Sequence, residues 1–129
     1  MKKKILILVI LLIVSLFIGY KYIYKSHRNI AVEKAEYIVL VHGLVEDFNQ
    51  SDSLSNIKYL DKTIDLKGRI TNIDLSSNSI MIDDKMNVIF TDSIPKNISE
   101  NQMINVKGRF IGYDDLLEEF KMDQVSIIN

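Results

Sequence analysis

Nearly the same phrase occurs twice in this sequence, as "IDLKGRI" at residues 64–70 and as "INVKGRF" at residues 104–110. In both phrases apolar residues alternate with polar ones, which is the period of a strand that buries one face. Each phrase also has a central glycine, Gly68 or Gly108, and a mid-strand glycine permits a kink or bulge. Two strands of a small closed barrel must bend in this way to serve both sides of the core. The repeat therefore predicts two long, bent strands of one β-barrel.

Shorter runs of the same alternation, separated by turn residues, surround the two phrases. Five such strands, with a long connection at residues 92–101 after the third, give the strand order of an OB-type Greek-key barrel. We expect all five strands to be antiparallel and the connection to hold at most one short helical turn. The predicted fold class is all-β with a helical N-terminal extension. The predicted strands begin at Thr63 and then cover residues 79–83, 88–91, 103–112 and 119–128.

The segment before the first strand carries conflicting signals. Four apolar residues recur at helical spacing, yet the segment is rich in β-branched residues and Gly43 weakens a helix. Residues 36–41 are therefore open between strand and helix, whereas residues 42–50 are predicted to be helical. Ser53 is expected to cap a short turn that continues through Lys58. The apolar stripe consists of Tyr37, Val41, Leu44 and Phe48.

The N-terminal segment is predicted to be a membrane-spanning helix. Residues 5–18 are apolar except for Ser15. Residues 5–24 would form a helix about 30 Å long, which matches the hydrocarbon core of a bilayer. The alternative is a cleaved signal peptide, because the short apolar core fits one, although no pair of small residues follows it at cleavage spacing. Interfacial aromatic residues are supplied by Tyr20, Tyr22 and Tyr24.

Positive charges stand on both sides of this segment, so the positive-inside bias is small. Because no other part of the chain is apolar enough to span a membrane, export of the C-terminal domain is expected. Five of the 16 Lys and Arg lie within residues 1–25, which leaves 11 against all 17 Asp and Glu in the remainder, a net charge of −6. An acidic domain repels phosphate backbones at long range.

Outward positions of the two repeated strands carry four basic side chains. They form a stripe that, with a nearby tyrosine, is the candidate binding face. Such a stripe beside an aromatic ring is typical of single-strand nucleic-acid binding, whereas the alternative is a solvated strand face balanced by neighbouring acids. Phe110 faces inward by parity and is assigned to the core. The candidate face consists of Lys67, Arg69, Lys107, Arg109 and Tyr113.

Residues for catalysis or cofactor binding are not evident. There is no cysteine, so disulfides, thiolate metal sites and cysteine nucleophiles are excluded. His27 and His42 have no partners at metal-ligand spacing. The acidic stretches at 83–84 and 113–119 could supply oxygen ligands for calcium, but they lack EF-hand spacing and fit solvated turns. We therefore expect no metal, no cofactor and no enzymatic activity.

Two longer stretches, residues 44–74 and 105–114, resemble the tRNA-anti-like OB-fold family of bacterial proteins. In that family a short helix leads through a Lys-Tyr pair and a further lysine into a glycine-centred strand. A later strand carries a Lys-Gly pair and then another glycine. The tether at residues 25–37 also resembles that of membrane-anchored members. The matching residues are Asn56, Lys58, Tyr59, Lys62, Gly68, Ile73, Val106, Lys107, Gly108 and Gly112.

The resemblance covers roughly residues 25–129 and implies an OB fold in which Gly68, Gly108 and Gly112 are structural. It does not imply tRNA binding, because the family name reflects likeness to anticodon-binding OB domains. Members often carry a cysteine in the third and last strands. This chain has none, so a disulfide of that kind is not expected.

Together these patterns predict a single-pass protein of the bacterial inner (plasma) membrane with an extracytoplasmic OB domain. Its expected role is non-catalytic binding of a protein or an envelope component. The alternatives are a single-stranded nucleic-acid-binding domain, which the negative charge disfavours, and a structural subunit of a membrane complex. The expected division is a signal-anchor helix at residues 1–25, a tether with a short helical segment at 26–60, and the OB-fold domain at 61–129.

Overall fold

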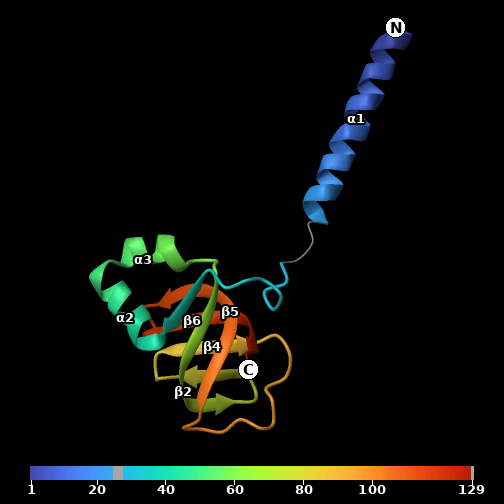
Figure 1. Cartoon of the computed structure of the whole chain (residues 1–129). Helices are drawn as coiled ribbons and strands as arrows, with labels where there is room; N and C mark the ends of the chain where they lie inside the picture. The colour runs from blue at the N-terminus through green and yellow to red at the C-terminus, as the bar shows by residue number, and fades with distance from the viewer. Residues whose placement is uncertain (25–27, 129) are drawn as a thin grey trace.

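The structure is a computed structural model that describes residues 1–24 and 28–128 (Figure 1). It begins with α1 (Lys2–Ile23), none of whose residues is buried. An 18-residue stretch of it has a mean hydropathy of 2.5, and it is the one helix of the described residues that is long and apolar enough to cross a membrane. A signal sequence has the same length and composition. His27 and the predicted boundary after residue 25 lie outside the described residues.

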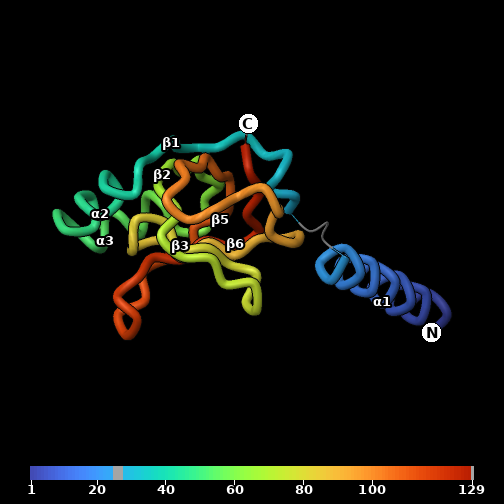
Figure 2. The backbone as a smooth tube through the Cα atoms, turned by 90° about the horizontal axis from the view of Figure 1, so that it is seen from below, coloured from blue at the N-terminus to red at the C-terminus, as the bar shows by residue number. Residues whose placement is uncertain are grey.

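Five strands close into a barrel of OB type, as predicted. The hydrogen-bonded order is β2-β3-β4-β6-β5, and β5 pairs with β2 to complete the circle. The repeated phrases lie in β2 and β5, the two longest strands. In the view of Figure 2, the β2–β3 and β5–β6 hairpins project from the same side of the barrel. The strands are β2 (Thr63–Asp74), β3 (Ser79–Ile82), β4 (Met86–Phe90), β5 (Met103–Asp114) and β6 (Glu119–Ile127).

One pairing differs from the prediction of five antiparallel strands. β4 and β6 pair in parallel, with Met86 opposite Phe120 and Val88 opposite Met122. The connection at 91–102 carries the chain across one end of the barrel to the free edge of β2. There β5 runs opposite to β2, and β6 returns by a hairpin beside β4 in the same direction. This connection contains turns and no helix.

The barrel interior is filled by the alternation that the repeat predicts. Inward side chains of β2 and β5 are each at most 5% exposed, which places both strands fully against the core. Side chains from the three shorter strands complete the same cluster. Burial of these apolar surfaces is the main driving force for closing the barrel. The inward residues of the two repeated strands are Ile64, Leu66, Ile70, Ile104, Val106 and Phe110.

Residues 36–41, open between strand and helix, divide between the two. β1 (Tyr37–Leu40) is a short strand that pairs in parallel with β2, and α2 (Val41–Gln50) begins directly after it. α2 packs its apolar stripe on one end of the barrel, where the Phe48 ring lies 5.8 Å from that of Phe110 and 4.9 Å from that of Phe120. Helices that precede β2, rather than an insert after the third strand, therefore cover this end.

α3 (Asp52–Tyr59) is longer than the short turn expected there, and its cap differs. The Ser51 hydroxyl, not that of Ser53, accepts a hydrogen bond from the Leu54 amide at 3.4 Å. Tyr59 is buried at the end of the barrel, where its ring lies 6.1 Å from that of Phe110. Its hydroxyl donates to the Asp47 carboxylate, which fastens α3 to α2.

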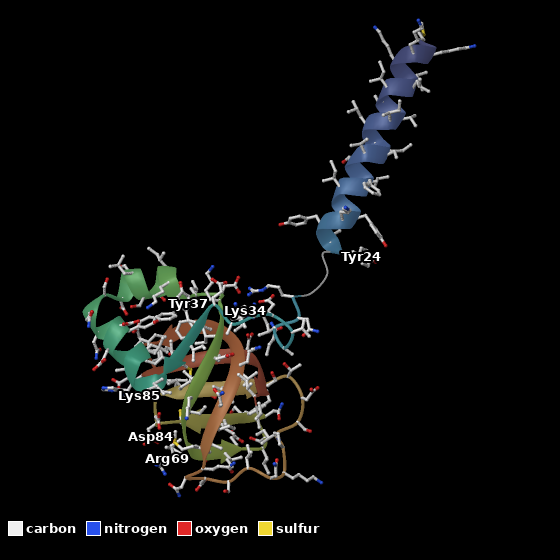
Figure 3. All side chains as sticks on the ribbon, in the orientation of Figure 1. Tyr24, Lys34, Tyr37, Arg69, Asp84 and Lys85 are labelled. Atoms are coloured by element: carbon white, nitrogen blue, oxygen red, sulfur yellow. The ribbon has the colours of Figure 1, made fainter. Side chains whose placement is uncertain are left out.

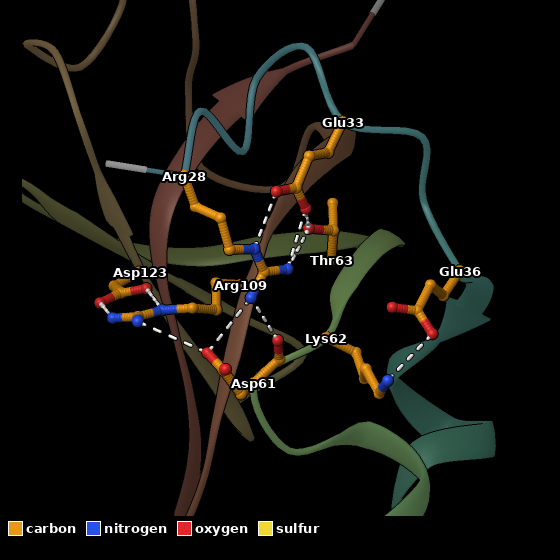
Figure 4. Close-up of polar contacts among 8 residues, drawn as sticks. All are labelled: Arg28, Glu33, Glu36, Asp61, Lys62, Thr63, Arg109 and Asp123. Atoms are coloured by element: carbon orange, nitrogen blue, oxygen red, sulfur yellow. Dashed lines mark hydrogen bonds and ion pairs between the residues drawn. The ribbon is translucent and has the colours of Figure 1, made fainter. Parts of the chain in front are cut away.

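The tether after Arg28 lies against the barrel through a polar cluster (Figure 4). Arg28 pairs with Glu33 at 2.8 Å and donates to the carbonyl of Asp61 at 2.8 Å. The Thr63 hydroxyl donates to Glu33 at 2.6 Å, and Ile30 is buried nearby. The chain is thus attached to the barrel at the beginning of β2. The predicted division into three segments stays a prediction.

Candidate binding surface

Three of the predicted basic residues lie together on the outer face of the β2–β5 pair. Lys67 and Arg69 are exposed, and Lys107 is half-buried. In the antiparallel register Lys67 stands opposite Asn105 and Lys107 opposite Asp65. Lys67 and Lys107 are therefore diagonal neighbours, a relation that separates residues by about 7–8 Å. They come together because their apolar neighbours in both strands turn into the core.

The two lysines differ from Arg69 in their surroundings. Among the described residues, the ion pairs involve neither Lys67 nor Lys107. The Arg69 guanidinium donates to the carbonyl of Asn101 at 3.0 Å, which fixes it where the pairing of β2 with β5 ends. Figure 3 shows Arg69 at the opposite end of the barrel from Lys34 and Tyr37 of the tether region. Two ammonium groups are thus available on this face.

Arg109, the fourth basic residue, is part of the polar cluster rather than a free cation. Its Nε donates to Asp123 at 2.8 Å, and its Nη1 lies 3.5 Å from Asp61. The hydrogen bond to Asp123 is the main cause that raises the pKa of Arg109. Two carboxylates neutralise this guanidinium, so it links β5 to β6 and to the chain before β2.

Tyr113 lies on a different surface from Lys67, Arg69 and Lys107. Its ring is 4.8 Å from that of Phe120 on the β5–β6 hairpin. Burial, and then the charges of Glu118 and Asp115, raise the pKa of its hydroxyl. It lines a pocket of about 440 Å³ between this hairpin and α2. The other lining residues are Val45, Phe48, Asn49, Asp52, Lys85 and Phe120.

The three glycines that the sequence marks as structural occupy positions that disfavour a side chain, two by close contacts and one by its backbone conformation. A Cβ at Gly68 would overlap the Ile82 side chain of β3, and one at Gly108 would lie 2.6 Å from Val125 of β6. The register of β5 with β6 also shifts at Gly108 and again before Gly112. Gly112 has a φ of +139°, which L side chains rarely adopt. Neighbouring strands therefore approach the two central glycines closely.

Acidic residues collect at the two hairpins and are held locally. Asp74 accepts hydrogen bonds from the Ser76 and Ser77 hydroxyls at 2.6 and 2.8 Å, and these lower its pKa to about 2. Asp114 accepts from the Leu117 amide at 3.1 Å and pairs with Lys121 at 2.9 Å. These carboxylates organise turns. Within the described part of the chain, no group of three His, Cys, Asp or Glu is arranged to hold a metal ion.

A comparison with models of known protein families gives a match for this chain. The model of the tRNA_anti-like family matches residues 1–124, nearly the whole chain.

The chain belongs to the tRNA_anti-like family.

This tRNA_anti-like protein is also similar to a solved structure. It is the crystal structure of a "putative nucleic acid-binding lipoprotein" from Klebsiella pneumoniae subsp. pneumoniae MGH 78578. The two chains are 12% identical, with a TM-score of 0.49, over 71% of this chain and 91% of that one. A comparison with curated proteins gives no match.

Sequence reasoning missed the pocket beside Tyr113 and the pairing of Arg109. The pocket needs α2 to lie against the β5–β6 hairpin, and no local pattern places a helix there. The partner of Arg109, Asp123, is 14 residues away on β6, across a register shift. Only the alternation of charges on facing strands could have indicated such a pair.

Proposed function

We propose that this tRNA_anti-like protein is a membrane-anchored, non-catalytic binding module. Its OB domain lies outside the cytoplasm, and the outer β2–β5 face binds a protein or an envelope component. The observation that supports this most directly is the pair of Lys67 and Lys107, diagonal neighbours without ion pairs in the described residues. A partner that presents carboxylate or phosphate groups would complement them. The antiparallel pairing of β2 with β5 keeps the spacing of the two lysine Cα atoms constant.

The membrane anchor in this proposal is α1. An 18-residue stretch of this helix has a mean hydropathy of 2.5, and none of its residues is buried against the barrel. An apolar helix of this length is stable in water only if something covers it, and a bilayer covers it completely. The Tyr20 and Tyr24 rings, 4.5 Å apart, would lie at the level of the lipid headgroups. We place the protein in the inner membrane of a bacterium.

Single-stranded nucleic acid is the less favoured ligand on two grounds. OB folds often bind oligonucleotides between the hairpins that flank β3 and β4, and here those hairpins carry Asp74, Asp114 and their acidic neighbours. Stacking platforms are also not at the basic face, because Phe110 is buried and Tyr113 lines the pocket beside α2. Both features favour a partner other than a polyanionic strand.

The proposal is tested by site-specific photocrosslinking of the full chain in its native membrane. The chain has no cysteine, so Asn105→Cys places a single photoreactive group on the exposed face opposite Lys67. This label is combined with charge reversal by Lys67→Glu and Lys107→Glu. The matched control reverses two lysines elsewhere, Lys34 and Lys96, so that both variants change the net charge equally.

We expect one crosslinked species with the native face and with the control variant, and its loss with the reversed face. Equal crosslinking by both charge variants would contradict the proposed surface. A crosslinked species that nucleases remove, and whose yield falls as salt rises, would instead favour the nucleic-acid alternative.

A further inference from the structure

α3 presents an apolar stripe to solvent. Leu54 is 68% exposed, Ile57 is 77% exposed and Leu60, at its C-terminal end, is 48% exposed. These residues stand three positions apart, so they lie along one side of the helix. Neither the barrel nor α2 covers this side. Isolated apolar side chains on a surface are ordinary, whereas neighbouring exposed ones that form a patch indicate a site of contact.

The opposite side of α3 is fixed to the domain, so the stripe cannot turn inward. Ser55 and Tyr59 are buried beneath the helix. The Lys58 ammonium lies 3.1 Å from the Asp47 carboxylate of α2 and 4.6 Å from the centre of the Tyr59 ring. These contacts hold the helix in one rotation about its axis. The outward direction of Leu54 and Ile57 is therefore a constant feature of the fold.

The end of α3 is also the place where the chain from α1 reaches the domain. Arg28 donates to the carbonyl of Asp61, the second residue after α3. Only four peptide units join Tyr24 to Arg28, and a chain of that length spans at most about 15 Å. The C-terminal end of α1 therefore lies within that distance of Arg28. In Figure 1 the tether and α3 lie along the same edge of the domain.

We propose that α3 lies in the membrane interface, with Leu54, Ile57 and Leu60 at the boundary between lipid headgroups and acyl chains. The inference rests on the proposed anchoring by α1, because it is the short link to Arg28 that brings α3 to the bilayer. The lipid surface itself thus covers the apolar stripe of α3. Helices of this kind bind membranes through apolar area that is buried at the interface. The β2–β5 face and the two hairpins would then be oriented by α3 as well as by α1.

The test uses single cysteines in the otherwise cysteine-free full chain. Ile57→Cys reports on the stripe, and Phe17→Cys reports on α1. Leu75→Cys, at the β2–β3 turn, is the matched control because that leucine is 78% exposed, as Ile57 is 77% exposed. Each cysteine carries an environment-sensitive fluorophore. The protein is reconstituted in phosphatidylcholine vesicles with and without lipids that bear a nitroxide quencher high on the acyl chain.

The expected result is loss of most of the emission at positions 17 and 57, with little loss at position 75. Quenching at position 17 with emission at position 57 as strong as at position 75 would overturn the interfacial placement and leave the anchor intact. Equal quenching at positions 57 and 75 would overturn the assignment to α3. Absence of quenching at position 17 would overturn the anchor, and the placement of α3 with it.

Discussion

At the scale of single residues, the similarity between the two repeated strands continues beyond the repeated phrases into the hairpin turns that follow them. Asp74 and Asp114 stand 40 residues apart, as the two phrases do, and each accepts backbone hydrogen bonds in the hairpin turn that follows its strand. The sequence predicted the strands from their alternation. It could not show which side chains leave no room for a Cβ atom at the central glycines. Those side chains are Ile82 and Val125, which belong to other strands.

The surroundings of Gly108 and Gly43 predict opposite effects on stability when each glycine is replaced by alanine. In Gly108→Ala the new methyl group would lie 2.6 Å from Val125 and 3.0 Å from the backbone oxygen of Asp123. Because overpacking strains its surroundings, we expect the free energy of unfolding to fall by about 1–3 kcal/mol. Gly43 lies in α2, and a Cβ added there would meet no atom within 4 Å, so Gly43→Ala should raise the free energy of unfolding by about 0.5–1 kcal/mol.

Chemical denaturation of the full chain in detergent micelles, followed by far-ultraviolet circular dichroism, measures both changes. A Gly108→Ala protein as stable as the native one would show that Val125 and β6 yield without strain.

At the scale of elements, the sequence predicted strands more accurately than helices. Period-two alternation is local, so β2 and β5 could be found directly. The conformation of residues 36–41 depends on pairing with β2. This pairing lets Tyr37–Leu40 form a strand, although Tyr37 begins an apolar stripe with helical spacing. The capping of α3 by Ser51 rather than Ser53 depends on the chain direction after α2. The attachment of the tether depends on Asp61 and Thr63, about 30 residues beyond Arg28.

The tether attachment predicts a pH dependence of stability. Hydrogen bonds from Arg28, and then from Thr63, lower the pKa of Glu33 from 4.5 to about 2. A carboxylate whose pKa is lower in the folded state stabilises that state above its unfolded pKa, and this contribution is lost as pH falls towards the folded pKa. Glu33→Gln should therefore be less stable than the native protein at pH 7, and the difference should shrink between pH 4.5 and pH 2.

Urea unfolding at a series of pH values measures this difference. Glu100→Gln, the same chemical change at an exposed glutamate of the connection between β4 and β5, is the control. A stability difference for Glu33→Gln that stays constant across the acidic range would contradict the role assigned to its charge.

At the scale of the whole molecule, an acidic OB domain follows a basic apolar helix. The barrel could be predicted from five strands in the right order, because few topologies close so few strands. The helices that cover one end of the barrel could not be predicted in the same way, because α2 and α3 precede β2 in the chain and their packing on the barrel depends on distant contacts. The candidate basic face was predicted as five residues. Three of them share one surface, while Arg109 is neutralised and Tyr113 lies beside α2.

The residues that follow the apolar core of α1 predict that this helix stays on the mature protein in the membrane. No pair of small residues follows its apolar core, because Phe17, Ile18, Tyr20 and Lys21 occupy the positions where a signal peptidase would need them. We therefore expect the peptides that mass spectrometry detects from the protein in a washed membrane fraction to include residues of α1. The double substitution Ile18→Ala and Tyr20→Ala introduces small residues at cleavage spacing and is the positive control for cleavage.

A native protein that begins after α1 and is recovered in the soluble fraction would show that α1 is a signal peptide. The OB domain would then act free of the membrane, and the interfacial role of α3 would lose its basis.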